Sequence, residues 1–79
     1  MNDPKAIAEE ERRIRELRLT VDLALFYISA GPLDLKEAVT LVEKVKAKVL
    51  RLFPGKEETF GLIYRPRFRR VLAGRFGLH

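Results

Sequence analysis

After Pro4, only two places in the first 55 residues interrupt a sequence that is compatible with helix throughout: Gly31-Pro32 and Pro54-Gly55. Proline cannot continue the hydrogen-bond ladder of a helix, and glycine suits the left-handed residue that closes one. The sequence therefore predicts helices over residues 4–29 and 34–53. Because the connection between them is short, we expect the two helices to lie antiparallel as a helical hairpin.

The start of each predicted helix carries a capping signal. Asp3 is a favourable N-cap and is followed by Pro4, which is tolerated at the first helical position because its missing N–H would be unpaired there. Asp34 and Glu37 are three residues apart, the spacing of a capping box.

Each of the two segments also has a seven-residue apolar repeat offset by three, which lays one apolar stripe along one helix face. The stripes consist of Ile7, Ile14, Leu17, Val21, Ala24 and Ile28 in the first segment and Leu35, Ala38, Val42, Val45, Val49 and Leu52 in the second. We expect these stripes to face each other in the core.

The C-terminal third predicts two short helices, over residues 57–64 and 66–73. A residue before proline is disfavoured in helical geometry, so Arg65 is expected to separate the two, with Gly74 ending the second. At 79 residues the chain is too small for more than one core, and an all-α single domain over residues 1–79 is predicted.

A second apolar face is predicted on the first helix, opposite its core stripe; it consists of Leu19, Leu23, Phe26 and Ala30. A helix in a two-helix hairpin buries only one side, so this face needs a cover. The C-terminal helices are one candidate, in a compact monomer, and a second copy of the chain is the other. We expect the second copy, in a homodimer with a four-helix core.

Composition excludes several classes of protein. Cysteine is absent, so disulfides and thiolate metal sites are impossible. The sequence has no uncharged apolar run of about 18 residues, which predicts no membrane span and a cytoplasmic location. Gln is absent and Asn occurs once, a tendency of thermophile proteins. The single histidine, His79, is at the chain end and is expected to have no ligand or base role.

Residues 56–79 carry six basic and two acidic side chains, and so hold +4 of the net charge of +5. Four arginines cluster around the start of the second short helix. Arginine at the start of a helix is disfavoured by the helix dipole, which suggests that an anion compensates this cluster. Tyr64 and Phe68 are close enough in sequence to stack on nucleic-acid bases. Alternatively, acids of Glu57-Glu58 or of residues 9–11 neutralise the cluster, within one chain or across a dimer. The clustered arginines are Arg65, Arg67, Arg69 and Arg70.

Enzyme signatures are sparse. The sequence has no Glu-x-x-His pair and no phosphate-binding glycine loop, and neither a metal nor a cofactor is predicted. Residues 14–22, IRELRLTVD, resemble the opening helix of all-helical chorismate mutases, and this resemblance over one helix implies a small dimer that holds a dicarboxylate with arginines. We predict a non-catalytic helical interaction or structural module. A nucleic-acid-binding accessory protein is the second hypothesis and a small anion-binding enzyme the third.

Overall fold

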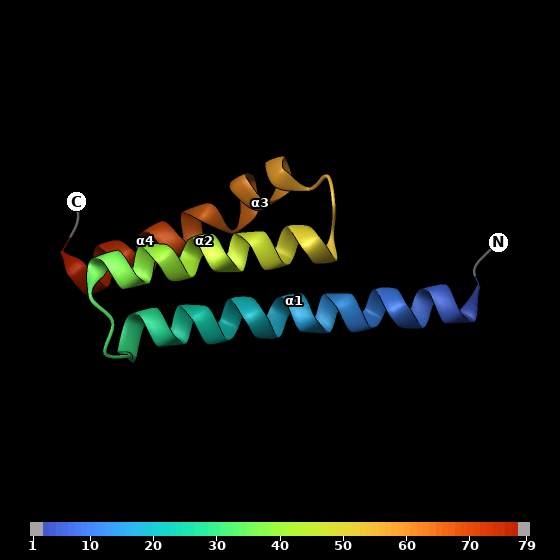
Figure 1. Cartoon of the computed structure of the whole chain (residues 1–79), viewed down its shortest axis with the longest axis horizontal. Helices are drawn as coiled ribbons and strands as arrows, with labels where there is room; N and C mark the ends of the chain where they lie inside the picture. Colours follow the sequence, from blue (N-terminus) through green and yellow to red (C-terminus); the bar gives the residue numbers. More distant parts are fainter. Residues whose placement is uncertain (1–2, 78–79) are drawn as a thin grey trace.

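The computed structural model describes residues 3–77 and is all-helical in that range, as predicted (Figure 1). Four α-helices follow one another along the chain: α1 (Pro4–Ala30), α2 (Leu35–Leu52), α3 (Glu57–Ile63) and α4 (Arg65–Phe76). The first two helices lie side by side and run in opposite directions, and α4 runs back along both of them (Figure 1).

Local capping chemistry defines the start of both long helices, as predicted. The Asp3 side chain accepts a hydrogen bond from the backbone N–H of Lys5 at 3.1 Å, and Pro4 occupies the first turn of α1. At the start of α2, the Glu37 N–H donates to Asp34 at 2.7 Å and the Asp34 N–H donates to Glu37 at 3.1 Å, which completes the capping box.

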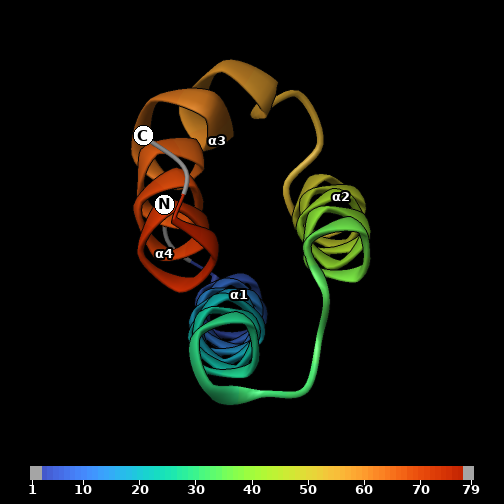
Figure 2. The same cartoon turned by 90° about the vertical axis from the view of Figure 1, so that its left-hand side faces the viewer.

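Viewed end-on, α1, α2 and α4 surround a common interior, and α3 lies above the space between α2 and α4 (Figure 2). The interior is filled by buried apolar side chains from all four helices, and within the described residues no polar side chain is buried among them. Hydrophobic burial therefore stabilises the packing of these helices. The fully packed residues are Val21, Ala24 and Ile28 of α1, Ala38, Val45 and Val49 of α2, Phe60 of α3 and Phe68 of α4.

The boundary between α3 and α4 differs from the prediction. Arg65 is the first residue of α4, and Tyr64 before it has helical angles of φ −98° and ψ −34°. Pro66 is in the first turn, where its missing N–H breaks no helical hydrogen bond, and the steric bias that proline places on the residue before it does not keep Arg65 out of the helix.

The end of α4 also differs from the prediction. The helix passes through Gly74 and stops at Gly77, which has φ +69° and closes it in the left-handed conformation. Phe76 follows Leu72 by one turn, and both pack against the core. This apolar packing extends the helix beyond the glycine that was expected to end it.

Gly31 ends α1 by a different mechanism from the expected left-handed closure. Its backbone is extended, with φ −82° and ψ 170°, and its N–H donates to the Tyr27 carbonyl oxygen. A Cβ at this position would lie 2.5 Å from that oxygen and 3.2 Å from the Tyr27 ring. Glycine is required here because the Tyr27 carbonyl lies too close for a Cβ, and not because φ is positive.

The first turns of α1 extend past the end of α2 and have no neighbouring helix (Figure 1). All side chains from residue 3 to residue 12 are exposed, including Ile7 at 42%. We call residues 3–12 the α1 overhang. Within residues 3–77, no helix combines the length and the apolar character needed to cross a bilayer.

Candidate interaction surfaces

An open groove of about 950 Å³ lies between α1 and α2, on the side away from α4; we call it the α1–α2 groove. Its floor is mostly apolar and its margin on α2 is basic. Leu33, from the connection between the two helices, closes one end, a role that helical periodicity could not assign. The lining residues include Leu23, Tyr27, Leu33, Leu41, Lys44 and Lys48.

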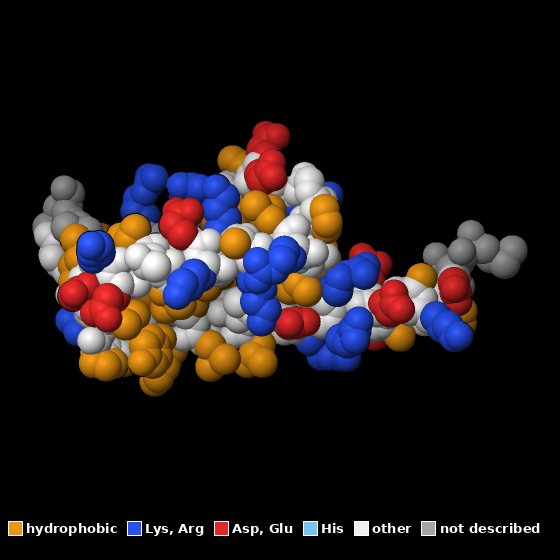
Figure 3. All heavy atoms as spheres, in the orientation of Figure 1, with side chains coloured by type: hydrophobic (Ala, Val, Ile, Leu, Met, Phe, Trp, Pro, Cys, Tyr) orange, Lys and Arg blue, Asp and Glu red, His pale blue; other side chains and the backbone are white. Residues whose placement is uncertain are grey.

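The second apolar face predicted on the first helix borders this groove and stays open. Leu19, Leu23 and Phe26 have exposed fractions of 60%, 59% and 67%, and Ala30 is also exposed. The C-terminal helices do not cover them, because α4 packs on the side of α1 that carries Val21 and Ile28. In Figure 3 hydrophobic side chains accordingly project from the C-terminal half of α1 along the lower edge of the molecule.

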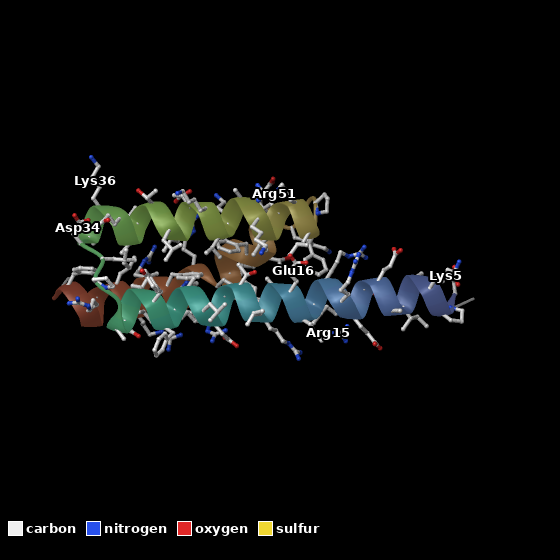
Figure 4. The ribbon with its side chains drawn as sticks, turned by 60° about the horizontal axis from the view of Figure 1, so that its bottom comes forward. Lys5, Arg15, Glu16, Asp34, Lys36 and Arg51 are labelled. Carbon is white, nitrogen blue, oxygen red and sulfur yellow. The ribbon has the colours of Figure 1, made fainter. Side chains whose placement is uncertain are left out.

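Charged groups border the groove. Lys48 Nζ lies 3.4 Å from Glu16 Oε1, and both side chains are nearly half exposed. In Figure 4 Glu16 lies on the side of α1 that faces α2, whereas Arg15 points away from α2. The other charged residues on the α2 margin are Lys36, Lys44 and Glu37, whose carboxylate accepts the capping-box hydrogen bond and keeps its charge.

A smaller hollow of about 220 Å³ lies between the middle of α1, the end of α2 and α3. Its walls include Leu17, Val49 and Phe60. Beside it, the Arg13 guanidinium lies 5.9 Å from the centre of the Phe53 ring, a cation–π arrangement that the sequence pattern did not predict. This interaction fastens the end of α2 to α1.

The four clustered arginines, within the first two turns of α4, are all exposed. Within residues 3–77 none of them makes an ion pair, and neither Glu57-Glu58 nor residues 9–11 neutralise them in the single chain. Arg75 differs, because its Nη2 donates to the Gly31 carbonyl oxygen at 3.4 Å and its guanidinium lies over the Phe76 ring.

The two aromatic residues predicted to stack on bases have different environments. Phe68 is 1% exposed and its ring stacks on Phe60 at 6.4 Å, so the prediction that it contacts a ligand is wrong. Its place at i, i+3 and i+4 with Val71 and Leu72 commits it to the core. Tyr64 is partly exposed, and its ring lies 5.8 Å from that of Phe60.

No cluster of metal-ligating side chains forms in the described part of the chain. Residues 3–77 contain no group of three or more His, Asp or Glu side chains placed to hold a metal, and His79 lies outside the described residues. Arg15 and Arg18, in the segment that resembles the chorismate mutases, are exposed and do not line the α1–α2 groove.

Comparison of the chain with protein-family models, with curated protein sequences and with solved structures finds no match. Function is therefore inferred from the two surfaces described above: the apolar α1–α2 groove and the exposed arginine cluster at the start of α4.

Proposed function

We propose that the chain is a small, non-catalytic helical interaction module that pairs with a second copy of itself through the α1–α2 groove. The observation that carries this proposal is the exposure of Leu19, Leu23 and Phe26 beside an apolar groove. Contiguous apolar surface of this kind on a small protein is typical of a protein–protein contact. Pairing would bury these side chains, which the four helices of one chain leave in water.

The shape of this face fits a two-fold interface. Two-fold contacts use the same patch on both chains, so a projecting part must lie next to a hollow that can receive it. Here Leu19 and Phe26 form a ridge on α1, and Leu23, Tyr27 and Leu41 line the hollow beside it. With the two-fold axis running along the helices, so that the two α1 helices are parallel, the ridge of each chain would enter the hollow of the other. The two α1–α2 hairpins would then form a four-helix core.

Charge also favours a second copy over an unrelated helix. By the helical period, Asp22 is on the border of the ridge away from α2, and it is exposed without an ion pair in residues 3–77. Lys44 is on the opposite margin of the groove. When a two-fold axis places one ridge in the other groove, each Asp22 faces the α2 margin of the other chain. Attraction between Asp22 of one chain and Lys44 of the other would support this placement of the two chains.

Oligomeric mass tests the proposal directly. We expect light scattering to give the mass of two chains at micromolar concentration, and Leu23→Glu or Phe26→Glu to reduce it to the mass of one, because a buried unpaired carboxylate is costly. Leu62→Glu is the matched control, since Leu62 is 72% exposed on α3 and does not line the groove.

The control variant should keep the mass of the unmodified chain. A mass of one chain for the unmodified protein would exclude the proposal. So would a dimer that neither groove substitution dissociates while circular dichroism shows the helices intact.

A further inference from the structure

The first turns of α4 carry an unusual density of positive charge. Four of the six residues from 65 to 70 are arginines, and all four are exposed. Within residues 3–77, none of the four guanidinium groups donates a hydrogen bond or forms an ion pair. By contrast, Arg13 and Arg75 have intramolecular partners, Phe53 for the first and Gly31 and Phe76 for the second. Arg12, Arg15, Arg18 and Arg51 also lack such partners in this range, so the four arginines of α4 differ by their density and by their place at a helix start.

Their position has an electrostatic cost. The first turn of α4 contains no acidic residue, and Arg65 and Arg67 lie at this end of the helix. The N-terminal end of a helix carries a partial positive charge, so each arginine there is disfavoured. Mutual repulsion within the cluster adds to this cost. A bound anion would offset both the unfavourable interaction with the helix dipole and the repulsion among the arginines.

The acidic residues that were expected to neutralise this positive charge lie elsewhere. Glu57 and Glu58 are in the first turn of α3, where the dipole of their own helix stabilises them. Residues 9–11 lie on the α1 overhang, and no ion pair joins them to α4. In the described part of the chain, no carboxylate compensates the cluster.

We propose that the exposed arginine cluster at the start of α4 binds the phosphate backbone of a nucleic acid without reading its sequence. The guanidinium fork matches phosphate oxygens in a bidentate way and stays charged at any physiological pH. Residues 65–70 extend over about 7.5 Å of helix axis, and each strand of a duplex carries one phosphate for about every 3.4 Å of the duplex axis. The cluster is thus long enough to meet more than one phosphate of a polymer.

The adjacent residues favour a nucleic acid over a lipid surface. A helix that lies on a membrane needs an apolar side turned toward the lipid. The apolar side chains of α4, namely Phe68, Val71, Leu72 and Phe76, pack against the core instead. Tyr64, beside Arg65, is partly exposed, but its ring packs against the core, 5.8 Å from that of Phe60, so the arginines carry the inference. This site is separate from the α1–α2 groove, so the inference does not depend on self-association.

Binding of a fluorescein-labelled oligonucleotide of mixed sequence, followed by anisotropy between about 50 and 200 mM salt, tests the inference. We expect affinity to fall with salt, and Arg69→Glu/Arg70→Glu to weaken binding at least about tenfold. The slope of log K against log salt should become shallower by about 0.9 for each duplex phosphate that the variant no longer neutralises, or about 0.7 for single strands. Circular dichroism verifies that the variant is folded, and Arg69→Gln/Arg70→Gln gives a milder test of the same side chains.

The matched control is Arg12→Glu/Arg15→Glu on α1, which changes the net charge by the same amount far from α4. Retention of binding by this variant supports a defined site. Equal weakening in the two charge-reversed variants would show that affinity follows net charge alone and would overturn the proposal. The proposal would also be overturned if the protein did not bind the oligonucleotide at about 50 mM salt, or if its affinity did not fall as salt is added. Binding to vesicles of anionic lipid without binding to the oligonucleotide would overturn it as well.

Discussion

The rings of Phe60 and Phe68 stack with their centres 6.4 Å apart and their planes 24° from parallel, across the bend that separates α3 from α4. Both side chains are buried, at 2% and 1% exposure. The pair fastens α3 to α4 and places the bend against the core that α1 and α2 share.

Truncation of this pair should be costly. We expect Phe68→Ala to lower the free energy of unfolding by about 3–5 kcal/mol, because it removes buried apolar area and leaves a cavity. Phe68→Leu should cost less. Urea unfolding followed by circular dichroism measures both, and Leu62→Ala, at an exposed position, should change the value by no more than about 0.5 kcal/mol. A small effect of Phe68→Ala would contradict the central position of this ring.

Two glycines should respond oppositely to alanine. Nothing lies within 4 Å of a Cβ built on Gly74, which is inside α4, so Gly74→Ala should stabilise the protein by about 0.5–1 kcal/mol. Gly31→Ala places a methyl 2.5 Å from the Tyr27 carbonyl oxygen and should destabilise it by about 1–3 kcal/mol. The unfolding temperatures of the two variants should therefore move in opposite directions, and equal shifts would be inconsistent with the close approach at Gly31.

The capping box should contribute measurably. Asp34→Ala removes the oxygen that accepts from the Glu37 N–H at 2.7 Å, and we expect a decrease of about 1 kcal/mol in the free energy of unfolding. Asp34→Asn retains an acceptor and serves as the control, with a smaller decrease. Denaturant titration measures both, and identical decreases would indicate that charge and not the hydrogen bond is important.

The Glu16–Lys48 ion pair should contribute little. Because both side chains are more than 40% exposed, a double-mutant cycle with Glu16→Ala and Lys48→Ala should give a coupling free energy below about 1 kcal/mol, decreasing with added salt. A larger coupling that resists salt would show that the pair is buried in solution, as it would be if a second chain covered this margin of the groove.

Charge exchange tests the register of the proposed dimer. Lys44→Asp should weaken pairing, because it would place a carboxylate opposite Asp22 of the other chain. Asp22→Lys combined with Lys44→Asp should recover the affinity, since opposite charges then face each other again. Sedimentation equilibrium measures both, and a double variant as weak as the single one would rule out this register but not the groove itself.

The features that were predictable from sequence are local. The caps at Asp3 and Asp34 depend on a few neighbouring residues, so residue type and spacing identify them. The exposed face of Leu19, Leu23 and Phe26 was also predictable, since periodicity alone places it opposite the core stripe. The features that could not be predicted from sequence depend on packing between residues far apart in the chain. Phe76 extends α4 past Gly74 only because the core receives it, and Phe68 is unavailable to a ligand for the same reason.

The α1 overhang has a consequence for how the helix opens in solution. Its turns have backbone hydrogen bonds but no tertiary cover, so their opening free energy should be far below that of residues 21–28, which carry the buried side chains of α1. Amide hydrogen exchange along α1 should therefore slow progressively from residue 5 toward residue 28. Brief trypsin treatment should cut first after Lys5 and Arg12, leaving the packed helices intact.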